Sequence, residues 1–375
     1  MTNRKSFPPQ YGKPLFRQHI PKSRGVKLQK KSLSKLSASR QRSGFVKLIL
    51  ISLLLFILII GLSKITQKIL FLLSIPHQVQ SVSPQAIATP SQTPSPTTST
   101  SDPTSILNLT QEIFPLKIEV QQLAAQKVGL TLGAFFVDLN TGTYLDVNGT
   151  EPFAAASMIK FPILVAFFQD VEAGLIRLDE MLTMTSEDIA KGNSSGNMQY
   201  KPPGTKFTAL ETVTKMITIS DNTATNMLIS RLGGATALNQ RFQSWGLRAT
   251  EIRNRLPDLS GTNTTTPLDL ATLMALVDHG NLVSTTSREQ LLDIMKRTTI
   301  RTLLPSGLGP GATIAHKTGD IGTLVGDVGL VTMPSGKRYI AVAMVRRPYN
   351  DRRAQKLIRQ VSHAVYQQFG TQQSI

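Results

Sequence analysis

The feature that most constrains this chain is an uninterrupted apolar run from Leu48 to Leu62, LILISLLLFILIIGL, which contains no charged residue. With its apolar neighbours the run reaches the roughly 20 residues that a membrane-spanning helix needs. Lys47 and Lys64 stand at its two ends, where their amines can reach the lipid headgroups. The run therefore predicts a membrane anchor and divides the chain into a short part before it and a long part after it.

The net charge of +18 belongs mainly to the part before the run. Residues 1–47 hold nearly a third of the 41 Lys/Arg and none of the 23 Asp/Glu, whereas the chain from Asp102 onward is nearly balanced. This distribution predicts a basic tail that contacts anionic headgroups, and we expect no nucleic-acid partner. Because Lys/Arg-rich segments stay in the cytoplasm, we expect a single-pass protein of the cytoplasmic membrane with its N-terminus inside and its large domain extracytoplasmic.

The alternative interpretation of the run is a cleaved signal peptide. The basic segment before it is long for that role, and no small-x-small cleavage site follows it directly. The pattern Ala86-Ile87-Ala88 lies well beyond the run. We therefore expect four segments: a basic cytoplasmic tail (1–44), an anchor region (45–75), a Pro/Ser/Thr-rich linker (76–105) and a globular domain (106–375).

The last segment has strand-like patterns at both ends and helical periodicity between them. Strands are expected at 132–140 and 144–147, and again at 312–319, 324–332 and 338–346; residues 157–300 are mostly helical. Helices are also expected from Leu109 to Val128, delayed or kinked by Pro115, and from Asp351 to Phe369. This order predicts an α/β protein of the α+β sandwich type, in which one antiparallel sheet from both chain ends is flanked by terminal helices and carries an inserted all-helical subdomain.

The first candidate catalytic pattern is Ser157-Met158-Ile159-Lys160. On a helix, positions i and i+3 share one face, so the two side chains can meet. A neutral, desolvated lysine can take the proton of a serine and make its hydroxyl a nucleophile. The pattern is weak alone, because Ser32-Leu33-Ser34-Lys35 also matches it in the basic tail.

Two further triplets strengthen the assignment. Ser220-Asp221-Asn222 lies between two helical segments, where it also fits an ordinary helix cap. Lys317-Thr318-Gly319 closes an expected strand, and its preceding residue, His316, is expected to point away from the groove by strand alternation. With no cysteine in the chain, a thiolate metal site and a cysteine nucleophile are excluded. We expect no metal and no cofactor.

In this order and setting, the three motifs resemble those of the class A β-lactamases and penicillin-binding proteins. The resemblance implies an active-serine hydrolase that opens a cyclic β-lactam amide through an acyl-enzyme on Ser157, with Lys160 as base. The remaining roles that it implies are proton transfer by Ser220, a substrate-amide contact by Asn222, carboxylate binding by Lys317 and Thr318, substrate clearance by Gly319, and an oxyanion site between the backbone N–H groups of Ser157 and Asp320.

The sequence departs from the resemblance in the loop before Asn263-Thr264-Thr265-Thr266-Pro267. Counting back without gaps places Thr250 where class A enzymes have the glutamate that activates the hydrolytic water. Glu251 is one residue away and is the candidate for that role if the loop adjusts. Without such a base, loss of roughly 10²- to 10⁴-fold in deacylation is expected.

Three functions therefore remain open: a β-lactam hydrolase, a penicillin-binding D-Ala-D-Ala-type peptidase or esterase with slow deacylation, and a cell-wall binding domain without turnover. The expected small-molecule partner is a β-lactam or a peptidoglycan stem peptide, and the expected assembly is a monomer.

Overall fold

The computed structural model describes residues 103–192 and 194–371. The predicted tail, the anchor and the linker up to residue 102 lie outside the described residues. Within the described ranges, none of the helices combines the length and the apolar character needed to cross a bilayer. The described domain begins with the short helix η1 (Pro103–Leu107).

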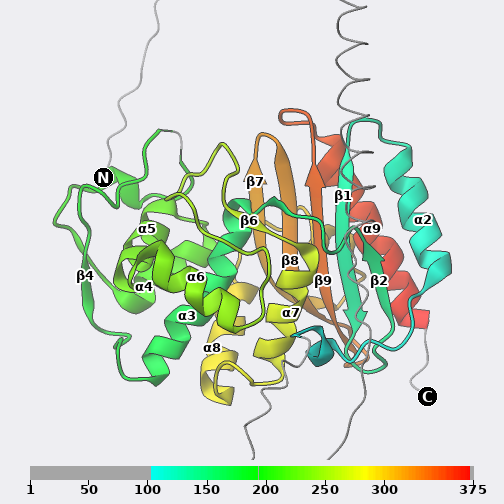
Figure 1. The fold of residues 1–375 in the computed structure, drawn as a ribbon, viewed down its shortest axis with the longest axis horizontal. Helices are drawn as coiled ribbons and strands as arrows, with labels where there is room; N and C mark the ends of the chain where they lie inside the picture. Colours follow the sequence, from blue (N-terminus) through cyan, green and yellow to red (C-terminus); the bar gives the residue numbers. More distant parts are fainter. Residues whose placement is uncertain (1–102, 193, 372–375) are drawn as a thin grey trace, which may run out of the picture. The chain divides into compact units, whose positions relative to one another are not determined.

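An antiparallel sheet forms the centre of this domain (Figure 1). In the described part of the chain it has five strands in the order β2-β1-β9-β8-β7. Their bounds are β1 (Thr131–Asp138), β2 (Tyr144–Val147), β7 (Thr313–Ile321), β8 (Leu324–Thr332) and β9 (Arg338–Arg346). Strand β1 pairs with β9 from Thr131↔Arg346 to Asp138↔Tyr339, so both ends of the domain meet in one sheet, as predicted.

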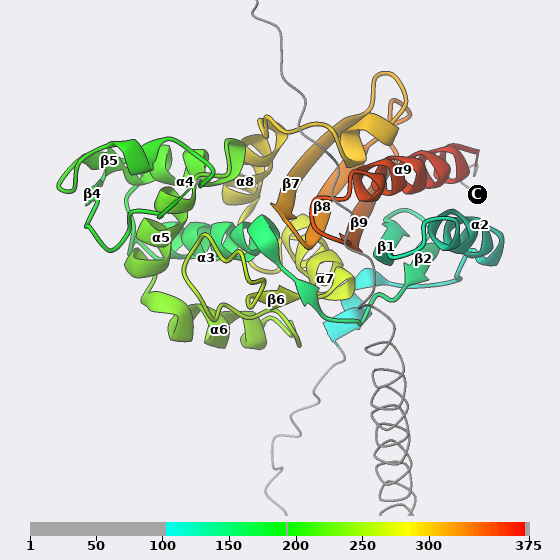
Figure 2. The same ribbon diagram turned by 90° about the horizontal axis from the view of Figure 1, so that it is seen from above.

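Both faces of the sheet are covered, which explains why β9 is apolar at nearly every position. Its side chains alternate between two hydrophobic clusters: Ile340, Val342 and Met344 face one, and Ala341 and Ala343 face the other. The second cluster includes α2 (Phe114–Ala125) and α9 (Arg353–Thr371), which lie side by side on that face (Figure 2). Helix α2 begins at Phe114 and not at Leu109, because Pro115 fits the first turn of a helix and not its interior.

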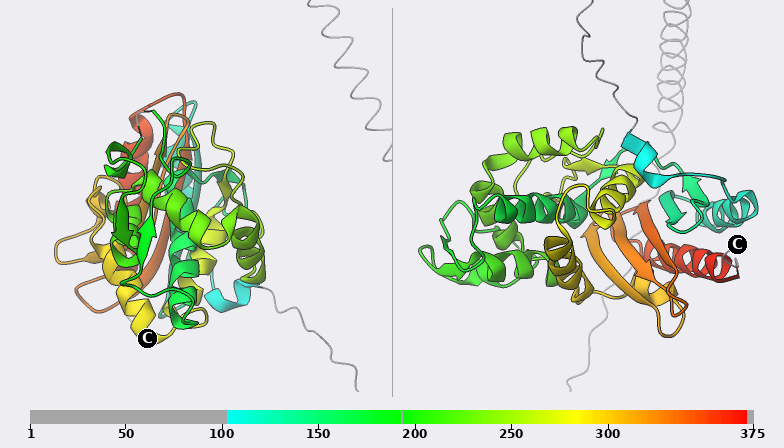
Figure 3. Two further views of the ribbon diagram at one scale, coloured as in Figure 1. Left: turned by 90° about the vertical axis from the view of Figure 1, so that its left-hand side faces the viewer. Right: turned by 90° about the horizontal axis from the view of Figure 1, so that it is seen from below.

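The opposite face carries the helical subdomain predicted between residues 157 and 300 (Figures 2 and 3). Its central helix, α3 (Lys160–Glu172), is buried on all sides from Phe161 to Phe168. The helices around it are α4 (Ala209–Thr218), α5 (Asn222–Arg231), α6 (Gly234–Ser244), α7 (Pro267–Asp278) and α8 (Thr285–Lys296).

Short elements connect these layers. The two-stranded ladders are β3 (Phe153–Ala154) with β6 (Thr264–Thr265) and β4 (Met181–Thr183) with β5 (Lys206–Thr208). The short helices are η2 (Ala156–Ile159), η3 (Met198–Tyr200) and η4 (Leu304–Gly307). Helix η2 contacts β7 of the sheet and runs directly into α3 of the subdomain. Ser157, which lies on η2, is therefore at the boundary between the two.

Candidate active site

Ser157 lies on η2, one turn before the buried body of α3. It is half-buried, whereas Ala155, Ala156 and Met158 beside it are buried. Ala156 has a φ of 45°, a region that residues other than glycine seldom adopt. Backbone strain of this kind concentrates at functional sites, so the local conformation singles out the hydroxyl that follows it.

Lys160 occupies the first position of α3 and is fully buried. Its amine donates hydrogen bonds to the Ser220 carbonyl and to the Asn222 side-chain carbonyl, both at 2.7 Å, and lies 3.1 Å from the Ser220 hydroxyl. Burial, followed by the positive charge of Lys317, holds the pKa of Lys160 well below its usual range, although Asp221 opposes the shift. A neutral amine of this kind can accept a proton from a nearby hydroxyl.

The turn between α4 and α5 supplies Ser220 and Asn222. Ser220 has a φ of 58°, and Asp221 caps α5 through the N–H of Ala224 at 2.9 Å. The second carboxylate oxygen of Asp221 accepts the N–H groups of Asn197 and Met198 at 2.7 and 2.9 Å. Asp221 therefore fixes the turn to the loop before η3, and the two polar side chains beside it keep their orientation.

Lys317 approaches Ser220 from strand β7. It is fully buried, and its amine donates to the Ser220 hydroxyl at 3.1 Å and to the Thr318 carbonyl at 2.7 Å. Burial lowers the pKa of Lys317 to about 7, and the charge of Asp327 opposes that shift. The amines of Lys160 on α3 and Lys317 on β7 thus meet at the Ser220 hydroxyl, although all three residues are far apart in the sequence.

A cavity of about 110 Å³ opens beside this cluster. Its lining includes Ser157, Ser220, Thr318 and Asp320, and the buried amines lie behind the Ser220 hydroxyl. The Asp320 carboxylate is bound by Arg347, and burial raises its pKa. The Ser157 hydroxyl makes no hydrogen bond to another described residue, although such bonds often tighten only when a substrate is present.

Gly319 lets β7 approach η2 closely. A Cβ at this position would lie 3.1 Å from the Cβ of Ala156 and 3.2 Å from the backbone nitrogen of Met158. Because contacts this short require a neighbour to move, the absence of a side chain sets the spacing between the edge strand and the nucleophile. The room that Gly319 provides is occupied at least in part by η2.

The structure brings Ser157, Ser220, Asn222, Lys160, Lys317, Thr318 and Asp320 together, but it does not bring Glu251 to the cavity. The Glu251 carboxylate is exposed and bound by Arg253, and its backbone pairs with Thr264 in the neck of the loop. Thr250, the position reached by counting without gaps, is buried in the same neck, 2.8 Å from the carboxylate of Asp269. Neither residue lines the cavity.

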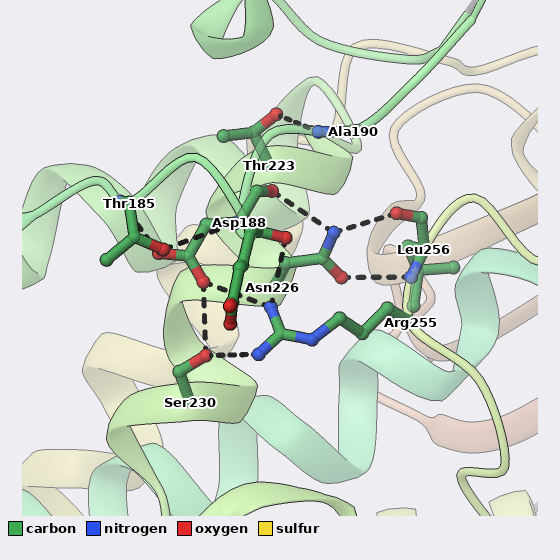
Figure 4. Close-up of polar contacts among 9 residues, drawn as sticks. Thr185, Asp188, Ala190, Thr223, Asn226, Ser230, Arg255 and Leu256 are labelled. Carbon is green, nitrogen blue, oxygen red and sulfur yellow. Dashed lines mark hydrogen bonds and ion pairs between the residues drawn. The ribbon is translucent and has the colours of Figure 1, made fainter. Parts of the chain in front are cut away.

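The loop residue that lies against α5 is Leu256, which the sequence reasoning did not identify. Asn226, one turn after Asn222, donates to the Leu256 carbonyl at 2.8 Å and accepts the Leu256 N–H at 2.9 Å (Figure 4). Arg255 adds contacts to Asp188 at 3.1 Å and to the Ser230 hydroxyl at 2.8 Å. The available signal was the Leu256-Pro257 pair, which resembles the other apolar residues of the loop, Ile252 and Leu259, too closely to stand out.

Comparisons with known proteins agree with this arrangement. Residues 115–369 match the model of the β-lactamase enzyme family. The β-lactamase of Streptomyces cellulosae is 27% identical over 227 residues (58% of this chain and 72% of the relative), and β-lactamase AER-1 of Aeromonas hydrophila is 29% identical over 255 residues (64% and 80%).

Among solved structures, PBP-A is 55% identical with a TM-score of 0.69, over 70% of this chain and 99% of that one. An acyl-enzyme complex of a PBP-A mutant with penicillin G is 56% identical with a TM-score of 0.68, over 70% and 98%. The predicted family and α+β fold are therefore confirmed. This chain belongs to the β-lactamase enzyme family and is a serine hydrolase of that family.

Proposed function

We propose that the chain binds β-lactams and opens their amide by forming an acyl-enzyme on Ser157, which it releases slowly. The observation that carries this proposal is the convergence of Lys160 and Lys317 on the Ser220 hydroxyl beside the cavity that Ser157 lines. The covalent penicillin complex of a PBP-A mutant, at 56% identity, supports the same chemistry.

The proposed acylation moves one proton along a short path. The Ser157 oxygen attacks the amide carbonyl while Lys160, neutral because it is desolvated, takes the hydroxyl proton. Ser220 lies within hydrogen-bond distance of the Lys160 amine, so it can pass that proton to the leaving nitrogen as the C–N bond breaks. The backbone N–H groups of Ser157 and Asp320 would stabilise the developing oxyanion.

Substrate orientation is assigned to the groups around this path. Lys317 and Thr318 would bind the substrate carboxylate, and Asn222 would contact its side-chain amide. The Asn222 side chain is held at both ends, by Lys160 at 2.7 Å and by the Ser194 hydroxyl at 2.7 Å. Such fixed groups cost little reorganisation when the substrate binds.

Slow release follows from the loop. Hydrolysis of the ester needs a base that activates a water, and such help contributes roughly 10²- to 10⁴-fold. The loop meets α5 through Leu256, which is apolar and buried, while Glu251 is bound by Arg253 at the surface. This arrangement favours a penicillin-binding peptidase or esterase over a rapid β-lactam hydrolase.

Rapid hydrolysis stays the second candidate, because relatives named β-lactamase match this domain at 26–29% identity. A binding domain without turnover is disfavoured by the two buried lysine amines that meet the Ser220 hydroxyl beside the cavity that Ser157 lines. We further propose, from the sequence, that residues 45–75 anchor the chain in the cytoplasmic membrane and that residues 76–105 hold a monomeric catalytic domain outside it. Protease protection in oriented vesicles would test that topology.

The enzymatic proposal is tested by labelling the detergent-solubilised full chain with a fluorescent penicillin and measuring intact mass. Covalent labelling should occur on the wild type and on Ser195→Ala, which alters the cavity lining outside the motifs, but not on Ser157→Ala. A label that persists favours the penicillin-binding activity, and a label lost with multiple turnovers favours the β-lactamase activity. No labelling of folded wild type would refute both.

A further inference from the structure

Lys317 is a buried cation without a carboxylate in contact. Its hydrogen-bond acceptors in the described chain are the Ser220 hydroxyl and the Thr318 carbonyl. An ammonium group buried among neutral partners is costly, and the usual outcome is loss of the proton. Yet binding a substrate carboxylate requires the charged form, so a negative charge nearby would have a direct role in the reaction.

Such a charge lies on the next strand. Asp327 on β8 is fully buried and pairs with Thr318, the residue after Lys317. Strand alternation directs Lys317 toward the subdomain and Asp327 toward the α9 face, because the neighbours Ala315 and Val325 belong to those two clusters respectively. The carboxylate therefore stands behind the strand that presents the lysine.

Two neighbours, His316 and Leu304, hold the Asp327 carboxylate in place. Its two oxygens lie 3.0 and 3.1 Å from Nδ1 of His316, and one also accepts the N–H of Leu304 at 3.2 Å. Nε2 of His316 is buried and has no hydrogen-bond partner in the described part of the chain. We assign the ring proton to Nδ1, where it meets the carboxylate, so that no buried N–H of His316 lacks an acceptor and the carboxylate keeps its negative charge.

The other charges around Lys317 do not replace this one. Lys160 on α3 is of the same sign, and Asp221 at the start of α5 acts on Lys160. Helix α8 also packs against β7, but its charged residues Glu289, Asp293 and Lys296 are exposed, and Arg288 is half-buried and bound to the Asp278 carbonyl. The attraction that favours the protonated form of Lys317 comes from Asp327.

We propose that Asp327, oriented by His316 and the Leu304 N–H, is the counter-charge that keeps Lys317 protonated and thereby gives the groove its preference for substrates with a carboxylate. This inference rests on the proposed function and assigns two positioning residues outside the three motifs. Asp327 does not touch substrate; it acts through the charge of Lys317.

The proposal predicts a specific kinetic defect in Asp327→Asn. Because the pKa of Lys317 is already about 7, a tenfold weakening of its proton binding lowers the ammonium fraction at pH 7 about fivefold. Acylation by penicillin G should fall by that factor or more, and its pH optimum should move to lower pH. Acylation by the uncharged methyl ester of penicillin G should change little.

The experiment measures acylation of the full chain by both compounds across pH, with folding checked by circular dichroism and thermal melting. Asp278→Asn is the matched control, because Asp278 is also buried and is paired with Arg338 at the other end of the sheet. The double variant Lys317→Arg/Asp327→Asn should have the same pH profile as Lys317→Arg, because a guanidinium stays charged whether or not Asp327 is present. His316→Gln, which still donates to Asp327, should retain the wild-type acid-over-ester preference.

The outcomes separate this inference from the proposed function. If neither compound acylates wild type, the proposed function fails. If wild type reacts but Asp327→Asn keeps the wild-type pH profile and acid-over-ester preference, this inference is wrong. If Asp327→Asn does not fold, the double variant Asp327→Asn/His316→Gln replaces it, because it places two neutral amides at the two positions. That variant should show the same loss of penicillin G acylation. A wild-type pH profile in it would equally overturn the proposal.

Discussion

Asn226 holds Leu256 by both backbone polar groups, donating to its carbonyl at 2.8 Å and accepting its N–H at 2.9 Å. Asn226 lies one turn after Asn222, which accepts a hydrogen bond from Lys160. An apolar residue is thus fastened to α5 one turn from Asn222, on the loop where a water-activating base would be expected. We expect the lifetime of the acyl-enzyme to depend on this relationship.

Replacing Leu256 with glutamate should speed deacylation. A carboxylate at that position could activate water, so we expect release of bound penicillin to accelerate about 10²-fold or more. The measurement is the decay of a fluorescent penicillin adduct on the full chain. Leu259→Glu is the control, because Leu259 lies on the same loop but is exposed. Equal decay rates in the two variants would contradict the role given to Leu256.

Removal of the Asn226 amide should affect both stability and turnover. Asn226→Ala leaves the buried N–H and carbonyl of Leu256 without partners, which should lower the free energy of unfolding by about 2 kcal/mol or more. Asn239 binds Ile252 in the same two-bond manner, at 2.9 and 2.8 Å, so Asn239→Ala is a matched control. We expect both variants to melt earlier and only Asn226→Ala to change the adduct lifetime. Identical lifetimes would show that the Asn226 contact is structural only.

Acylation by penicillin G should have a bell-shaped pH profile. Lys160 must be neutral, so the rate rises as pH increases through its lowered pKa. Lys317 must be protonated, so the rate falls as pH increases past about 7. Stopped-flow acylation of wild type and Lys317→Arg checks this, because the guanidinium should remove the fall near 7. A fall that persists in Lys317→Arg would assign that limb to another group.

A methyl group at Gly319 should slow acylation. Gly319→Ala forces β7 away from η2, since the added Cβ would meet Ala156 at 3.1 Å. Overpacking of this kind costs about 1–3 kcal/mol, and we expect a loss of at least tenfold in the acylation rate. Gly370→Ala on α9 meets only the end of Met333, at 3.2 Å, and should keep full activity. A fully active Gly319→Ala would show that the spacing of strand and nucleophile is not critical.

The sheet and the motif residues were predictable because each depends on a regular pattern. The strands at 324–332 and 338–346 follow from mainly apolar runs bounded by turn residues, and the structure has these bounds. The loop from 248 to 263 was not predictable by counting, because side-chain hydrogen bonds set its course. Asn263 accepts the N–H groups of Arg253 and Asn254 at 2.7 and 2.8 Å, and such contacts leave no periodic signal.

The residues that surround Lys160 and Lys317 could not be predicted from the sequence either. The spacing predicts that Lys160 meets Ser157, whereas the amine binds Ser220 and Asn222 from another element. The pairing of Asp327 with His316 depends on the register of β7 and β8, which no motif specifies. Charges that act across a sheet become visible only when that register is known.

The pairing of β1 with β9 along their whole length has a consequence for synthesis. A chain that has emerged only as far as β8 already contains Ser157, Ser220 and Lys317, but the central position of its sheet is empty. Activity should therefore appear only late in synthesis, when β9 (residues 338–346) inserts between β1, which is made early, and β8, which is made just before it. Premature termination anywhere before that point should yield no partially active enzyme.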